Sequence, residues 1–499
     1  MSWKIIWKSL KNSDMRNRIF AVMGMLLVFR VLAHIPIPLS NPETLQQVLE
    51  NLFNSQSSQL LSFIDVLSGG ALANFSIMLI GLGPYINASI IMQLLTRAIP
   101  QLEELNKEGE FGRKKINQIT RILTLPLAIV QSVGAIYLVR QTASRIGGIG
   151  DITANTSVGH WILMISALTG GAMLLMWLGE LITEQSIGNG ISLIITVGIV
   201  SQLPQMISSI ASNIIDKSSS WVILGKGFPI NKTQAITGAC ILLGTLIITI
   251  VVVKLNEASR KITIHYAKRV QGNRTYGGGT TILPIKLITA GVVPIIFATA
   301  FLSVPSFVGQ LLSSSESARL QELGGNLVIW FQNPSAQTFA QPGFIPYIYP
   351  IVYFLLVFVF TFFYTSITFD SKEISENLQK QGGFIEGVRS GKQTERYLSK
   401  IINRLTLFGG LALGVLALVP IIAQIFVPAN IALGGTSILI LVSVALETLR
   451  AVESRALMVT YDQYEEPDFF YDVSEPVDAA MGARRLRNRL PSIKRSKKS

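Results

Sequence analysis

The 499-residue chain has little charge, a single cysteine and three histidines. Only 14% of its residues are charged and 49% are hydrophobic, whereas an average soluble domain is about 25% charged. So much apolar content excludes a disordered polymer, and the lone Cys240 excludes a disulfide scaffold. The chain still carries a net charge of +13, so the distribution of its charges has to decide its class.

Motifs of catalysis and metal binding are missing as well. His34, His160 and His265 lie far apart in the sequence and form no zinc-binding motif. The chain has neither a phosphate-binding loop nor a nucleophile elbow of the G-x-S-x-G type. We therefore expect no enzyme, no catalytic residue, no metal site and no cofactor.

Long runs without charge dominate the sequence, for example residues 152–179, 323–369 and 405–446. An apolar stretch of about 20 residues is what a helix needs to cross a bilayer. We predict an all-α, polytopic membrane protein. Its ten expected spans are 19–38, 75–96, 118–139, 160–180, 189–211, 234–253, 286–308, 346–368, 405–426 and 435–456.

Basic residues set the expected orientation, because loops rich in Lys and Arg stay in the cytoplasm. The first residues, 1–18, are basic, whereas 31–65 contain no Lys or Arg. Alternating from there places the basic loops at 97–117, 254–285 and 369–404 inside. We expect an uncleaved, multi-pass protein of the inner (cytoplasmic) cell membrane, with both termini cytoplasmic.

Ten spans suit a channel, and they also suit a membrane enzyme or a carrier for a lipid-linked or small anionic substrate. A carrier coupled to protons usually buries ionisable residues in its spans, and here only Arg30 lies well within one. Glu180 and Glu184 are the acidic candidates for an enzyme, but we expect both to face cytoplasmic water. Ionisable content therefore favours a channel.

The region before the second span is interrupted by Gly69-Gly70 and then by Gly81, Gly83 and Pro84. Such residues are tolerated at membrane depth only where the backbone faces protein or water. Two interpretations stay open, a half-inserted short helix at about 62–74 or a simple surface turn ahead of the span.

Several short motifs, in this order and at these spacings, resemble the SecY family of protein-conducting channels over about residues 15–458. They are SGGAL at 68–72, PYINASII at 84–91, EGE at 108–110, GRKKI at 112–116, MWLGE at 176–180, IGNGIS at 187–192, YAKR at 266–269, LPIK at 283–286 and GGTS at 434–437.

The resemblance implies two pseudo-symmetric halves of five helices around an hourglass pore. The first half would be 19–215, the second 234–457, with an external loop at 216–233 between them. The half-inserted helix at 62–74 would be a plug that closes the outer funnel. Its plug and hinge residues would be Asp65, Ser68, Gly69, Gly70 and Ala71.

A ring of apolar side chains would seal the pore, because a narrow dry constriction excludes hydrated ions. The ring carried over from the family is Leu82, Ile86, Ile191, Ile195, Ile296 and Ile440. Signal sequences would leave sideways through a lateral gate, between spans two and three on one half and seven and eight on the other. Asn87 and Gln93 would be polar residues of this gate, and Pro294 would ease bending in span seven.

The loops at 254–285 and 369–404 would dock partners through Lys268, Arg269, Arg274 and Arg389. The partners that the family implies are the motor ATPase SecA, the ribosome with its RNA, small SecE-like and SecG-like subunits, signal sequences and nascent chains. This chain would thus translocate secretory proteins and insert membrane proteins into the bilayer.

The tail at 458–499 is acidic and then basic, with seven acidic residues at 458–478 and eight basic ones at 484–498. We expect it to be disordered, and its basic end suits anionic lipid or RNA.

Overall fold

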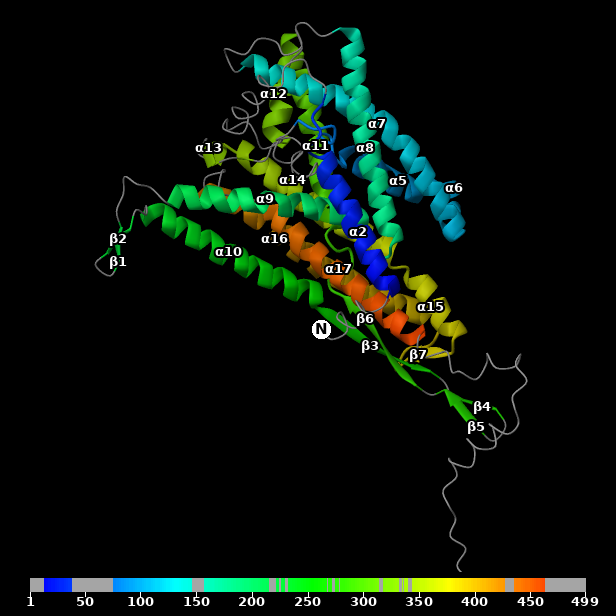
Figure 1. Cartoon of the computed structure of the whole chain (residues 1–499). Helices are drawn as coiled ribbons and strands as arrows, with labels where there is room; N and C mark the ends of the chain where they lie inside the picture. The colour runs from blue at the N-terminus through cyan, green and yellow to red at the C-terminus, as the bar shows by residue number, and fades with distance from the viewer. Residues whose placement is uncertain are drawn as a thin grey trace, which may run out of the picture.

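The computed structural model of the chain (Figure 1) is mostly helical. It describes residues 13–37, 75–145, 157–214, 221–223, 226–228, 232–266, 268–271, 274–277, 279–313, 317–331, 334, 336–339, 343–426 and 435–462. The expected plug at 62–74, with Asp65, Ser68, Gly69, Gly70 and Ala71, lies outside these ranges. Most of the expected tail at 458–499 also lies outside these ranges. Only its beginning is described, because the last helix continues to Asp462.

The first part of the chain is mostly helical among its described residues. Its helices are α2 (Ser13–Leu32), α5 (Gly83–Ala98), α6 (Pro100–Lys107), α7 (Glu110–Arg145), α8 (Val158–Glu184) and α9 (Gly190–Ile214). A chain this apolar forms helices in a bilayer because a helix satisfies its backbone N–H and C=O groups within one segment.

The second part combines helices with short strands. Its helices are α10 (Lys232–Glu257), α11 (Val293–Leu312), α12 (Ala318–Phe331), α13 (Ala336–Phe339), α14 (Ile345–Thr368), α15 (Ser371–Lys380), α16 (Lys392–Phe426) and α17 (Gly435–Asp462). Its strands are β1 (Trp221–Ile223), β2 (Lys226–Phe228), β3 (Ser259–Tyr266), β4 (Lys268–Gln271), β5 (Arg274–Gly277), β6 (Thr280–Lys286) and β7 (Gly383–Ile385).

Each of the ten expected spans overlaps one of the long helices. Among the described residues, six helical segments are long and apolar enough to cross a membrane. Five lie in α7, α8, α10, α11 and α16, and the sixth runs from α14 into α15. Gly190–Pro204 in α9 is a shorter apolar segment. The helical membrane fold is therefore confirmed, and a total of ten crossings is consistent with it.

The second expected span begins later than predicted. Residues 75–82 form turns, Ser76 pairs with Pro36 in an isolated bridge, and α5 starts only at Gly83. Two backbone positions explain the delay, because Phe75 has φ of 47° and Gly81 has φ of 62°, which is not helical. Pro84 then opens the helix, where its missing N–H removes no hydrogen bond.

The seventh expected span is also shifted. Residues 280–286 belong to strand β6, and a turn with Gly291 at φ 62° precedes α11. Pro294 therefore lies in the first turn of α11 and not in its interior. A proline in the first turn breaks no helical hydrogen bond, so the expectation that Pro294 eases bending of this helix is wrong. The interior proline is Pro305.

The two expected docking loops are folded and joined by a sheet, which the helical interpretation missed. Its order is β6-β3-β7, with antiparallel pairing throughout. Ile262 and Ile264 alternate with exposed residues along β3 and pack with Leu398 of α16 in a small core. Figure 1 shows that the β4–β5 hairpin extends beyond this sheet, away from the helices.

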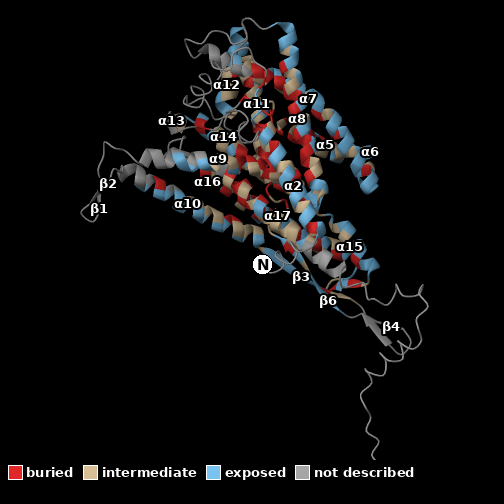
Figure 2. Ribbon diagram, viewed as in Figure 1, coloured by how far each residue is buried: buried red, intermediate tan, exposed pale blue. Residues whose placement is uncertain are grey.

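Buried residues concentrate where the central helices meet, and the peripheral helix α10 is largely exposed (Figure 2). One large apolar cluster contains buried residues of α2, α5, α8, α9, α10, α11, α14, α16 and α17. The core of the protein therefore lies between the helices of its two parts.

Candidate functional site

The six residues expected to form the pore ring meet in the large apolar cluster. Five of them are at most 6% exposed, and the sixth, Ile191, is half-buried and packs against the same cluster. Four helices supply them: Leu82 and Ile86 come from the start of α5, Ile191 and Ile195 from α9, Ile296 from α11 and Ile440 from α17. The ring residues, as these six are called from here on, thus connect the first part of the chain to the second.

Helix starts hold several ring residues in place. The carbonyl oxygen of Leu82 accepts the backbone N–H of Ile86 at 3.0 Å, so these two residues lie one helical turn apart. Asn189 caps α9, because its Oδ1 accepts the Ile191 N–H at 3.1 Å. Thr183 of α8 accepts the Gly190 N–H at 2.9 Å, which ties the start of α9 to the end of α8.

The seam is the contact of α5 and α7 with α11 and α14, where the lateral gate is expected. The Phe307 side chain of α11 lies directly against Gly134 of α7, so closely that a Cβ at Gly134 would overlap its ring. At the other end of the seam, the Arg97 Nη2 of α5 donates to the Ser366 carbonyl oxygen of α14 at 2.7 Å. Contacts at both ends therefore join the two parts of the chain.

The polar residues expected at the gate lie on α5. Asn87 and Gln93 are both half-buried. Gln93 donates to Ser89 Oγ at 3.2 Å within the same helix, and its Oε1 is buried without a hydrogen bond. An unsatisfied buried acceptor costs about 1–3 kcal/mol, so this side of α5 is packed less favourably than an apolar core.

The expectation that Glu180 faces cytoplasmic water is wrong. Its carboxylate lies beside the Arg121 guanidinium of α7, with an Nη2 to Oε2 distance of 2.6 Å and an Nε to Oε1 distance of 2.9 Å. Its side chain is only 16% exposed. The Arg121 side chain is 46% exposed, so this is a half-buried ion pair that joins α7 to α8.

The expected docking residues come from the sheet region. Lys268 and Arg269 lie on β4, and Arg274 lies on the paired strand β5. Arg389 is exposed in the connection between β7 and α16, and its carbonyl oxygen accepts the Thr394 hydroxyl at 2.9 Å. The hairpin is thus a separate two-stranded sheet, whereas the Arg389 connection follows a strand of the β6-β3-β7 sheet.

Polar contacts join the helix ends that lie next to the sheet. The Arg450 Nη2 of α17 donates to the Asn256 carbonyl oxygen of α10 at 3.0 Å, and Asn256 Nδ2 donates to Ser443 Oγ at 3.0 Å. At the end of β6, burial and the nearby Arg450 lower the pKa of the Lys286 ammonium. Strand β3 therefore follows a helix end that is hydrogen-bonded to α17.

Some of these features had a sequence signal and others had none. Ile262 and Ile264 show the alternation of a half-buried strand, which was missed because the region was interpreted as a loop. Nothing in the sequence pairs Gly134 with Phe307 or Arg121 with Glu180, because those contacts depend on how helices pack. Within the described residues, no group of His, Cys, Asp and Glu is arranged to hold a metal ion.

A bundle of apolar helices with a shared cluster between its two parts defines a polytopic membrane protein of the channel or carrier class. The SecY profile matches residues 76–449. The chain is 39% identical to the protein translocase subunit SecY of Corynebacterium glutamicum, over 92% of this chain and 98% of the relative. It is 36% identical to the same subunit of Streptomyces coelicolor, again over 92% and 98%. The chain belongs to the SecY family.

A solved structure has the same fold at low sequence identity. It is a structure of a SecY protein whose plug domain stabilises the closed state of the translocation channel and maintains a membrane seal. The likeness has a TM-score of 0.58 with 18% identity and covers 90% of this chain and 94% of that one. The fold of the described residues is therefore that of this channel.

We predict that Gly134→Ala destabilises the seam, because the added methyl group overlaps the Phe307 ring. The expected loss is about 1–3 kcal/mol in the free energy of unfolding, as for other overpacked cores. The measurement is a denaturation series on the purified complex in detergent.

Gly170→Ala in α8 is the matched control, because nothing lies within 4 Å of a Cβ there. In a Phe307→Ala background, Gly134→Ala should become neutral or stabilising. The seam assignment fails if Gly134→Ala is as harmless as the control, or if its cost is the same without the ring.

Proposed function

We propose that this chain is the protein-conducting channel subunit of a membrane protein translocase, and that it is not an enzyme. Membership of the SecY family supports the class. The observation that carries the proposal is the meeting of the ring residues in one buried cluster between the two parts of the chain. The protein is a multi-pass protein of the cell membrane.

The ring residues act as the seal of the closed channel. Six aliphatic side chains present neither charge nor hydrogen-bonding groups, so a hydrated ion entering between them would lose its water without compensation. The same lack of specific groups allows a polypeptide of any sequence to pass once the helices move apart. The segment at 62–74 acts as the plug.

The seam acts as the lateral gate for signal sequences and for membrane segments. Two contacts across the seam support this role. The Phe307 ring lies on Gly134, and Arg97 donates to the Ser366 carbonyl oxygen. Asn87 and Gln93 belong to this gate. The unpaired Oε1 of Gln93 favours opening, because separation of the helices exposes that oxygen to water or to a passing chain.

Both termini and the sheet face the cytoplasm, since the basic residues concentrate there. Lys268, Arg269, Arg274 and Arg389 dock SecA or the ribosome, whose RNA attracts basic groups. The small SecE-like and SecG-like subunits complete the complex. The driving force comes from these partners, because the sequence has no phosphate-binding loop of its own.

The proposed function is tested with a photocrosslinker at Ile86 and a secretory protein stalled halfway across the membrane. We expect crosslinks to the stalled chain at Ile86, which is 4% exposed in the cluster, and none at the control position Leu242, which is 63% exposed on α10. Crosslinks elsewhere in the membrane but never at Ile86 would rule out this route.

A second variant tests the docking face. Arg389→Glu reverses an exposed charge, so SecA-driven export should slow several-fold while the complex still assembles, because charge complementarity mainly sets the rate of association. Export kinetics in vesicles measure this effect. Lys372→Glu on α15 is the matched control, and equal export rates for wild type and Arg389→Glu would refute the docking role of this residue.

A further inference from the structure

One face of α16 changes from basic to apolar along its length. An open cavity of about 770 Å³ follows this face, lined by Glu395, Arg396, Ser399, Lys400, Asn403, Arg404, Leu407 and Phe408. The opposite face of the helix, with Leu398, Ile401 and Ile402, packs into the small core under the sheet. The lined face is thus the one that α16 turns away from the protein interior.

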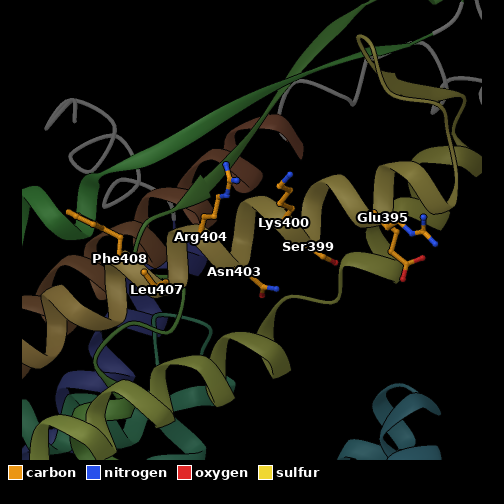
Figure 3. A pocket seen from close by; sticks show the side chains of 8 residues that line it. Glu395, Ser399, Lys400, Asn403, Arg404, Leu407 and Phe408 are labelled. Carbon is orange, nitrogen blue, oxygen red and sulfur yellow. The ribbon is translucent and has the colours of Figure 1, made fainter.

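Three cations lie along this face at intervals of four residues. Arg396, Lys400 and Arg404 are all exposed, and residues four apart lie on one side of a helix. Figure 3 shows Lys400 and Arg404 leaving the same side of α16. The first and last of the three are about 12 Å apart along the helix axis.

These cations are not neutralised by neighbouring carboxylates. Within the described part of the chain, no ion pair joins Arg396, Lys400 or Arg404 to an acidic side chain. Glu395 is the one acidic residue among those that line the cavity. The face therefore carries a net positive charge that is open to an anion.

The same face becomes apolar immediately after Arg404. Leu407 and Phe408 are 51% and 61% exposed, and Leu411, Val415 and Ile422 continue the exposed apolar stripe. Arg404 is also the last charged residue before the charge-free run 405–446. It therefore stands at the depth where lipid phosphates lie, with acyl chains beside the residues that follow.

We propose that Arg396, Lys400 and Arg404, together with Leu407 and Phe408, bind an anionic phospholipid, with the phosphate at the cations and the acyl chains along the apolar stripe. A free phosphate would use the cations but would leave the exposed Leu407 and Phe408 without a partner. The site requires only that α16 crosses the membrane boundary near Arg404, and not the channel function.

The test uses the whole translocase complex in vesicles of phosphatidylcholine and photoactivatable phosphatidylglycerol, at a ratio of about three to one. We expect labelled peptides to include residues 396–408. Arg404→Gln should lower this labelling about fivefold, as expected for one basic side chain at an anionic surface, and the triple variant with Arg396→Gln and Lys400→Gln should lower it further. Arg404→Lys should keep most of it.

Two controls test whether the labelling depends on these three cations and on the negative charge of the lipid. The triple variant Lys372→Gln, Lys380→Gln and Lys392→Gln removes as many exposed cations outside the cavity lining and should leave the labelling unchanged. A photoactivatable phosphatidylcholine should label the site weakly in wild type. Equal labelling by the neutral lipid, equal loss in the control triple, displacement by inorganic phosphate, or protection of the site by a protein subunit would each overturn the proposal.

Discussion

The apolar cluster between the two parts of the chain is the contact on which the rest of the structure depends. Its ring residues come from α5, α9, α11 and α17, and all but the half-buried Ile191 are almost fully buried. In a bilayer, lipid tails are as apolar as these side chains, so close packing rather than the hydrophobic effect holds such helices together. The ring residues themselves are aliphatic, so they add no polar bond to this contact that would prevent the helices from separating.

The contacts around the cluster differ in strength, and this difference indicates which helices move together. Arg121 and Glu180 form a half-buried ion pair that joins α7 to α8, and the capped start of α9 is tied to α8 through Thr183. Across the seam, by contrast, α7 meets α11 through the Phe307 ring at Gly134. Opening is therefore expected to separate α7 from α11 while α7, α8 and α9 stay together.

Much of the fold could be predicted because long charge-free runs have one physical solution in a bilayer. The ring residues could be named from the resemblance alone, since an isoleucine at Ile296 has no property that distinguishes it from any other core residue. Helix starts were misplaced at Gly83 and Val293, where a positive φ at Gly81 or Gly291 interrupts an apolar run without changing its hydropathy. The pairing of Arg121 with Glu180 joins residues 59 positions apart, which no local pattern reveals.

The central claim is that the ring residues seal the channel, and ion leak through the reconstituted complex tests it most directly. Ile440 and Leu439 are adjacent on α17 and 6% and 1% exposed, so an Asn substitution at either position disrupts a similarly buried site. If the ring is the seal, Ile440→Asn raises the ion conductance of the resting channel well above that of wild type, and Leu439→Asn does not. A resting conductance that is unchanged by Ile440→Asn, or raised equally by both variants, would contradict the account.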